Sequence, residues 1–146
     1  MPYSEILITP MREDLTRHGI LEARTPAKVD ELLKPGGGTV LMVTNSVCGC
    51  AAGKARPGVA VALKNTAHPP DVAATVFAGG DVEAVAHLRE KYLAEVPPSS
   101  PSVALFRDGK PVWVMHRSQI EGNDPLTIAR TLMSAFDEYC VKQTAS

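Results

Sequence analysis

Hydrophobic positions along the chain fall into short blocks that predict alternating helices and strands. The run 39–44 is apolar on both faces, which is typical of a central strand covered by helices on each side. A second apolar strand is predicted over 72–78. A third run, 103–106, is followed by Asp108-Gly109, a strong hairpin signal, and by a returning strand over 111–115.

Two short helices are predicted before the first strand. Thr9-Pro10 and Thr25-Pro26 each place an N-cap hydroxyl directly before a proline at the first helical position. Glycines follow both segments and are typical of helix ends.

Longer helices are expected between and after the strands. Apolar residues at helical spacing predict a helix over 51–63, another that Asp81 caps, and a last one from Asp124 to Cys140. Pro57 lies inside the first of these and is expected to kink it, because proline removes a backbone donor. The order of elements indicates an α/β fold with a central mixed β-sheet flanked by helices.

Composition and charge then exclude several classes of protein. The chain has 146 residues, of which 45% are hydrophobic and 21% charged, as in globular domains. Fifteen basic against sixteen acidic residues leave no positive field that would drive nucleic-acid or membrane-surface binding. No signal peptide is evident, and no apolar run approaches the roughly 20 residues that span a bilayer. We therefore expect one cytoplasmic domain over 1–146, with 1–38 as an N-terminal helical extension, and neither a nucleic-acid nor a membrane partner.

Cys48-Gly49-Cys50 is the motif that carries chemistry. It falls between a predicted strand and a predicted helix, where free amide donors and the helix dipole favour a thiolate. Gly49 allows the chain to contract enough for the two sulfurs to bridge. The resulting ring is smaller than that of a C-x-x-C motif and more strained, which predicts a relatively oxidising couple.

Other interpretations of the cysteines stay open. Two small buried cysteines can simply pack beneath a tight turn. A zinc or copper site can be built from Cys48, Cys50 and either a distant histidine or Cys140. Cys140 itself lies in the apolar stripe of the last helix, which favours a small buried hydrophobic residue over a redox role.

At 45–53, which reads NSVCGCAAG, and at 55–57, which reads ARP, the chain resembles the bacilliredoxins. These are thioredoxin-like bacterial proteins once described as a disulfide-isomerase family. This resemblance extends over nearly the whole chain. The resemblance implies a thioredoxin-like fold and a thiol–disulfide oxidoreductase that removes bacillithiol from S-thiolated proteins. Cys48 would be the attacking cysteine and Cys50 the resolving one. No metal or organic cofactor is implied, and a low-molecular-weight thiol such as bacillithiol would be the co-substrate.

The stretch from Ser100 through the hairpin resembles the cis-proline strand of thioredoxins. This implies that Pro101 follows a cis bond and that the backbone beside it positions the substrate. Thioredoxins also keep a buried acid on the strand before the cysteines. Here 39–47 contains no Asp or Glu, and Met42 lies near the equivalent place, which argues against a dithiol reductase of the thioredoxin type.

Polar residues near the cysteines complete the candidate site. Thr44, Asn45 and Ser46 can offer hydrogen bonds to a thiolate, although all three are also ordinary turn residues. Arg56 is a candidate partner for an anionic thiol or its carboxylates. The expected substrate-binding residues are therefore Asn45, Ser46, Gly49, Arg56, Ser100 and Pro101.

Two further functions are compatible with this sequence. The same cysteines would serve a protein disulfide isomerase or a general oxidoreductase. A non-enzymatic metal-binding or redox-sensing module is the alternative outside catalysis.

Overall fold

One five-stranded mixed sheet runs through the structure, a computed structural model that describes residues 2–141. The strand order is β1-β3-β2-β4-β5, in which β1, β3 and β2 run parallel and β4 is antiparallel to both β2 and β5. The strands are β1 (Leu21–Glu22), β2 (Thr39–Asn45), β3 (Val72–Phe77), β4 (Ser102–Arg107) and β5 (Lys110–Met115). The predicted α/β class with a mixed sheet is confirmed.

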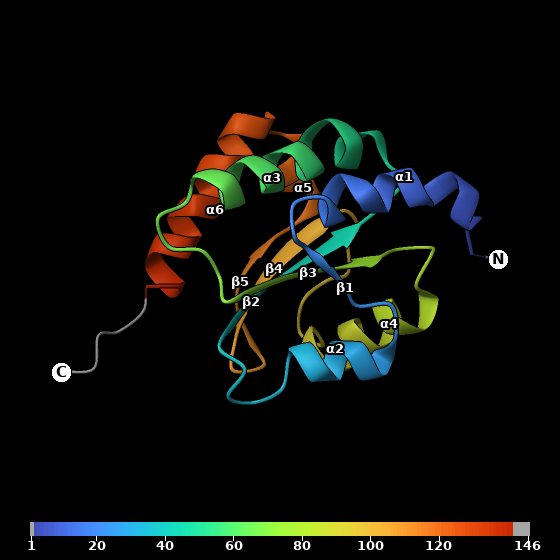
Figure 1. Ribbon diagram of the computed structural model, residues 1–146, viewed down its shortest axis with the longest axis horizontal. Helices are drawn as coiled ribbons and strands as arrows, with labels where there is room; N and C mark the ends of the chain where they lie inside the picture. The colour runs from blue at the N-terminus through green and yellow to red at the C-terminus, as the bar shows by residue number, and fades with distance from the viewer. Residues whose placement is uncertain (1, 142–146) are drawn as a thin grey trace.

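Helices cover both faces of this sheet (Figure 1). In the view of Figure 1, α1, α3, α5 and α6 lie above the sheet, and α2 and α4 lie below it. Their bounds are α1 (Glu5–Thr16), α2 (Pro26–Leu32), α3 (Arg56–Asn65), α4 (Val82–His87), α5 (Arg117–Glu121) and α6 (Pro125–Tyr139), with π-helical turns η1 (Ala51–Ala55) before α3 and η2 (Leu88–Tyr92) after α4.

Strand β2 is central and is buried along its whole length, as its apolar sequence predicts. Because side chains alternate across a strand, Leu41 and Val43 join the core under α3 and α6. Val40 and Met42 join the second core, on the side of α2 and α4. The loop that follows β2 is therefore anchored between two packed layers.

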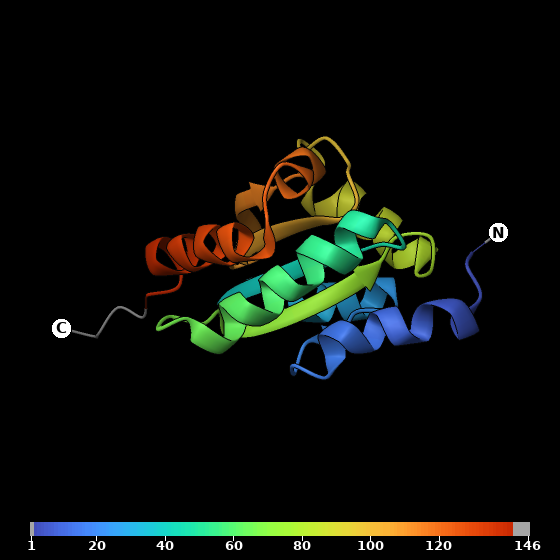
Figure 2. The ribbon, with the colours of Figure 1, turned by 90° about the horizontal axis from the view of Figure 1, so that it is seen from above.

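The pairing of α3 and α6 closes the upper layer. Figure 2 shows the two helices side by side. Gly58 of α3 lies at their contact, where an added Cβ would come within 2.6 Å of the Ile128 Cγ2 atom. The lack of a side chain at this position lets the two helices approach closely.

The first helix begins earlier than predicted. It starts after Ser4, whose hydroxyl accepts a hydrogen bond from the Ile6 amide, and Pro10 lies inside it. Burial of Ile8 against the fold stabilises this earlier turn. Segment 1–38 is also not only helical, because it contributes β1, which pairs with β3 at the edge of the sheet.

Most other predicted boundaries agree with the structure. Thr25 caps α2, and Asp124 caps α6. The hairpin turns through Asp108 and Gly109 with φ of 51° and 81°, as a tight primed turn requires. Pro57 lies inside a continuous helical segment, because α3 follows η1 without a break over 51–65. The π-helical turn directly precedes it, so the helix is irregular where proline removes a backbone donor.

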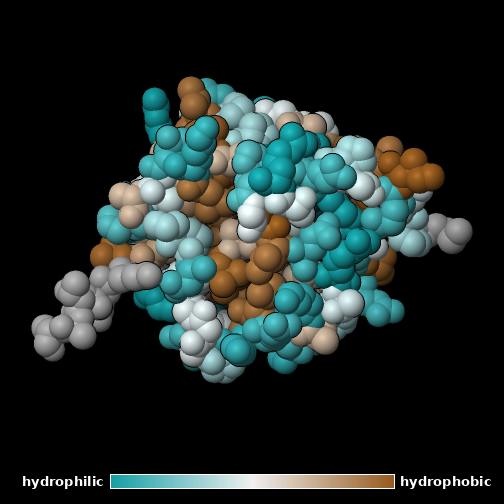
Figure 3. All heavy atoms as spheres, viewed as in Figure 1, coloured by the Kyte–Doolittle hydropathy of each residue, from teal (hydrophilic) through white to brown (hydrophobic). Residues whose placement is uncertain are grey.

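Hydrophilic side chains cover much of the face seen in Figure 3, with apolar side chains gathered between them. Within the part of the chain that the structure describes, the most exposed large apolar residue is Ile6 of α1. No helix within residues 2–141 is long and apolar enough to cross a membrane.

Candidate active site

The loop after β2 places Cys48 at the beginning of a helix. The Cys48 carbonyl accepts hydrogen bonds from the Ala51 and Ala52 amides over 3.0 and 3.3 Å, so the first helical turn starts at this residue. The Ser46 hydroxyl accepts a hydrogen bond from the Cys48 amide over 3.0 Å. Gly49 is exposed, and both cysteines are half-buried. The interpretation as two cysteines packed inertly beneath a turn does not fit this exposure.

The two sulfurs are close, but their environments differ. Cys48 Sγ lies 2.8 Å from Cys50 Sγ. A hydrogen bond from the Cys50 thiol, another from the Cys50 amide and the positive charge of Arg117 lower the pKa of Cys48. Burial and the neighbouring sulfur raise the pKa of Cys50. Cys48 is therefore favoured as the thiolate nucleophile, and Cys50 as a thiol held next to it.

Arg117 of α5 is a site residue that the sequence did not reveal. Its Nη2 atom donates to Cys48 Sγ over 3.2 Å, and its Nη1 atom donates to the Ser100 carbonyl over 3.3 Å. Its Nε atom lies 2.6 Å from an oxygen of Glu121. One side chain thus connects the cysteine loop, the proline loop and a carboxylate.

The only sequence signal for this short helix is the spacing of His116 and Gln119. The Gln119 side chain accepts a hydrogen bond from the His116 amide over 2.9 Å, as in a capping box. Histidine is not a favoured N-cap residue, and five residues give too little apolar periodicity to predict a helix.

The peptide bond between Ser100 and Pro101 is cis, as the resemblance implied. Pro101 is buried and Ser100 is half-buried. Through the Ser100 carbonyl and Arg117, this loop lies beside the Cys48 sulfur.

Asn45, Ser46 and Arg56 come together beneath the loop rather than at the sulfur. The Arg56 Nη1 atom donates to the Asn45 side chain and to the Ser46 carbonyl, both over 3.0 Å. The Arg56 Nε atom lies 3.1 Å from an oxygen of Asp14 in α1, and the Asn45 amide group donates to the Met11 carbonyl over 3.1 Å. These contacts fix the loop to α1 and α3, and the cation at the sulfur is Arg117.

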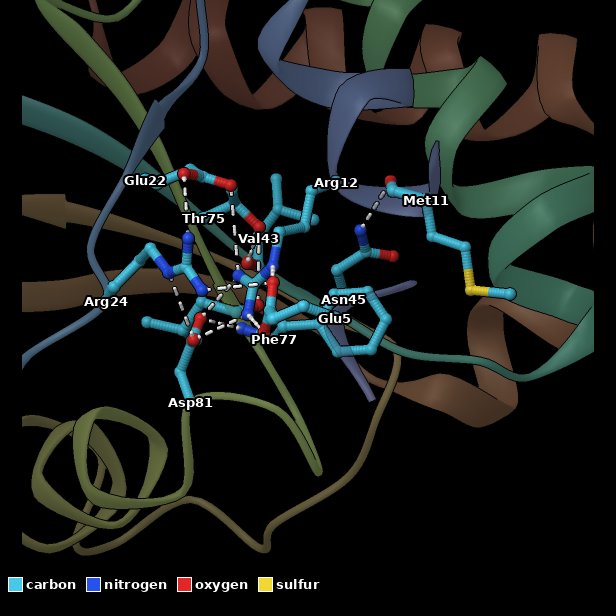
Figure 4. A network of polar contacts seen from close by, with 11 residues as sticks. Glu5, Met11, Arg12, Glu22, Arg24, Val43, Asn45, Thr75, Phe77 and Asp81 are labelled. Atoms are coloured by element: carbon cyan, nitrogen blue, oxygen red, sulfur yellow. Dashed lines mark hydrogen bonds and ion pairs between the residues drawn. The ribbon is translucent and has the colours of Figure 1, made fainter. Parts of the chain in front are cut away.

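A second polar network is centred on Arg12 of α1 (Figure 4). The buried guanidinium of Arg12 donates to both oxygens of Asp81, over 2.9 and 2.7 Å, and also to Glu5. Asp81 stands at the predicted N-cap position of α4, but its carboxylate accepts from Arg12 and from the Phe77 amide instead of capping the helix.

The cluster of possible metal ligands coincides with the cysteine site. Among the described residues, Cys48 Sγ, Cys50 Sγ and a carboxylate oxygen of Glu121 lie within 4.8 Å of one another. Neither a histidine nor Cys140 belongs to this group; Cys140 is buried at the end of α6. Two thiolates on one tetrahedral zinc would stand about 3.8 Å apart, given Zn–S bonds of about 2.3 Å. The two sulfurs, 2.8 Å apart, are closer together than this spacing.

Comparison with known proteins finds similar sequences over nearly the whole chain. The model of the Disulphide isomerase family matches residues 3–140. A bacilliredoxin of Salinibacter ruber is 54% identical over 141 residues, which cover 96% of this chain and 82% of that protein. A bacilliredoxin of Halalkalibacterium halodurans is 46% identical over 94% of each chain. One of Bacillus cereus is 44% identical over 94% of this chain and 95% of its own.

Solved structures support the fold. A mutant thioredoxin from Halobacterium salinarum superposes with a TM-score of 0.58 at 18% identity, covering 90% of this chain and 96% of its own. The oxidised thioredoxin of Plasmodium falciparum gives a TM-score of 0.57 at 15% identity over 84% of this chain and 99% of its own. The thioredoxin-like fold is thus confirmed, and the chain belongs to the bacilliredoxin family of thiol–disulfide oxidoreductases.

Proposed function

We propose that this oxidoreductase removes bacillithiol from S-thiolated client proteins in the reducing environment of the cytoplasm. The observation that carries the proposal is the position of the Cys48 sulfur. It is half exposed and lies 2.8 Å from the Cys50 sulfur and 3.2 Å from the Arg117 guanidinium. The bacilliredoxin name of its relatives supports bacillithiol as the small thiol.

In the first step, the Cys48 thiolate attacks the bacillithiol sulfur of the mixed disulfide on the client. The disulfide bond of the client breaks, and its cysteine leaves with the electron pair as a thiolate. A new disulfide then joins Cys48 to bacillithiol. The backbone beside Pro101 would hold the client chain during this attack.

In the second step, the adduct on Cys48 is resolved. Cys50 attacks Cys48 Sγ and releases bacillithiol, which closes the Cys48–Cys50 disulfide; alternatively, a second bacillithiol attacks the adduct and regenerates Cys48 directly. Both routes use thiols alone, so the chemistry requires no metal or organic cofactor. The partners are the thiolated clients and the small thiol.

A Cys50→Ser variant tests the first step, because it can accept the adduct but cannot resolve it internally. After incubation with a bacillithiolated protein, mass spectrometry should find bacillithiol on Cys48 and a free thiol on the client. A Cys48→Ser variant is the matched control and should carry no adduct. An adduct on Cys140, or none at all, would reject the proposal.

Disulfide isomerisation is a second candidate, favoured by the description of the matching family model. Rates on a bacillithiol adduct, a glutathione adduct and scrambled ribonuclease distinguish the two. De-bacillithiolation predicts the highest rate on the first substrate, whereas an isomerase acts best on the scrambled protein.

A further inference from the structure

We propose that the Glu121 carboxylate accepts the proton of Cys50 when Cys50 attacks the adduct on Cys48. One of its oxygens and both cysteine sulfurs lie within 4.8 Å of one another. This distance allows proton transfer directly after a small rotation or through one intervening water. The inference rests on the proposed function only in that Cys50 resolves an adduct on Cys48.

A proton acceptor is needed because a thiol must lose its proton to attack. Only the thiolate is nucleophilic, and burial keeps the pKa of Cys50 above its ordinary value. Strand β2, which leads into the cysteine loop, contains no Asp or Glu in Thr39–Asn45. Met42 occupies its buried interior on the side of α2 and α4. The acid at the site therefore comes from α5, on another part of the chain.

Glu121 is both held in place and open to solvent. The Arg117 Nε atom contacts its carboxylate over 2.6 Å, and the Lys54 ammonium of η1 donates to its main-chain carbonyl. The side chain of Glu121 is 49% exposed, so a proton taken from Cys50 can pass on to water. The charged side chains seen in contact with Glu121 are these two cations, and the titratable groups beside it are the two cysteines.

Proton transfer and disulfide formation occur together in this step. The Cys50 thiol gives its proton to the Glu121 carboxylate, and its sulfur forms a bond to Cys48 Sγ. The bond between Cys48 and the small thiol breaks, and the small thiol leaves as a thiolate with the electron pair. Glu121 then returns the proton to that thiolate or to water, so the carboxylate is restored and the cysteine pair is oxidised at the expense of the adduct.

Ellman's reagent tests this step, because one equivalent forms an adduct on Cys48 with release of one thionitrobenzoate, and attack by Cys50 releases a second. In stopped-flow measurements, Glu121→Gln should leave the first release at least as fast as in the wild type. The second release should slow about tenfold near neutral pH, a modest effect for a general base because the carboxylate is half exposed. Glu31→Gln, which alters an exposed glutamate of α2, is the matched control and should change neither phase.

The pH dependence separates a proton acceptor from a structural residue. Above the pKa of Cys50 the thiol ionises without help, so the second phase of Glu121→Gln should rise to the wild-type rate in alkaline buffer. Added acetate should also speed the second phase of Glu121→Ala. A second phase that equals the wild type at every pH, or that is slower by one constant factor throughout, would overturn the proposal.

The outcome is independent of bacillithiol, because Ellman's reagent supplies the adduct. Failure of the proposed function would appear instead as a missing bacillithiol adduct on Cys48 in the Cys50→Ser variant.

Discussion

The guanidinium of Arg117 donates to the Cys48 sulfur over 3.2 Å, although 69 positions separate the two residues in the chain. An arginine keeps its charge at all physiological pH values, so its attraction to a thiolate does not depend on its own protonation. Since the same side chain also holds the Ser100 carbonyl, the charge that stabilises Cys48 is fixed relative to the proline loop.

Replacing Arg117 by alanine should raise the pKa of Cys48. The native pKa lies below its ordinary value, partly because of this cation, and its loss makes the thiolate less abundant at neutral pH. The rate of alkylation by iodoacetamide should fall several-fold near pH 7, and its midpoint in a pH series should move upward. Arg130→Ala, an exposed position on α6, is the control. An unmoved midpoint in Arg117→Ala would contradict this role.

Asp81→Asn should destabilise the fold strongly. The Arg12–Asp81 pair is buried on both sides, at 4% and 7% exposure, and removing the Asp81 charge deprives the guanidinium of its only buried carboxylate partner among the described residues. We expect the free energy of unfolding in urea to fall by about 3–5 kcal/mol. Glu5→Gln removes a half-exposed partner of the same arginine and should cost less than about 1 kcal/mol. Equal losses in the two variants would show that burial of the pair does not matter.

Gly58→Ala should destabilise the protein despite the higher helix propensity of alanine. The added Cβ would come within 2.6 Å of Ile128 Cγ2, so α3 and α6 would have to move apart, at a cost of about 1–3 kcal/mol. Gly53→Ala, in the preceding turn, meets no atom within 4 Å and provides the matched control. Thermal unfolding should show a lower midpoint for the first variant and an unchanged or higher one for the second. The reverse order would exclude close packing as the reason for Gly58.

Acid should weaken the hydrogen bonds that join α2 to the helical segment formed by α4 and η2. Asp30 accepts hydrogen bonds from Tyr92, from His87 and from Lys91. The Tyr92 hydroxyl and the two other donors hold its pKa well below the usual range. A carboxyl with a lowered folded-state pKa stabilises the fold above its unfolded value of about 4, and this contribution is lost as pH falls.

Urea titrations at decreasing pH measure this contribution. The free energy of unfolding should fall less steeply with acidification in Asp30→Asn than in the wild type, and the two should converge at low pH. Tyr92→Phe removes the strongest donor and should change the slope in the same direction by a smaller amount. Parallel slopes in all three proteins would contradict the assignment.

Much of the fold follows from the sequence because its strands are short and uniformly apolar. The run 39–44 predicts a buried central strand, and β2 is one. Asp108-Gly109 predicts the hairpin because few residues tolerate its positive φ angles. Strand β1 has two residues and no pattern of its own; it exists because β3 offers an unpaired edge.

The sequence predicts only part of the candidate site. The cysteine motif and its position before a helix indicate a reactive thiol, and the structure places Cys48 at a helix start. Arg117 and Glu121 carry no such local signal, because their helix is short and tertiary contacts bring it to the cysteines. Arg56 lies close to the motif in sequence, yet burial turns its guanidinium toward Asn45 and Ser46. Arg56 was selected because it is close to the motif in sequence, and in the structure it anchors the loop.

Strand β2 is paired on both edges and covered on both faces, so its carboxyl end can fray only if the whole sheet opens. The nucleophile, Cys48, lies three residues beyond that end. The thiol that undergoes exchange is therefore attached to one of the most firmly held segments of the sheet.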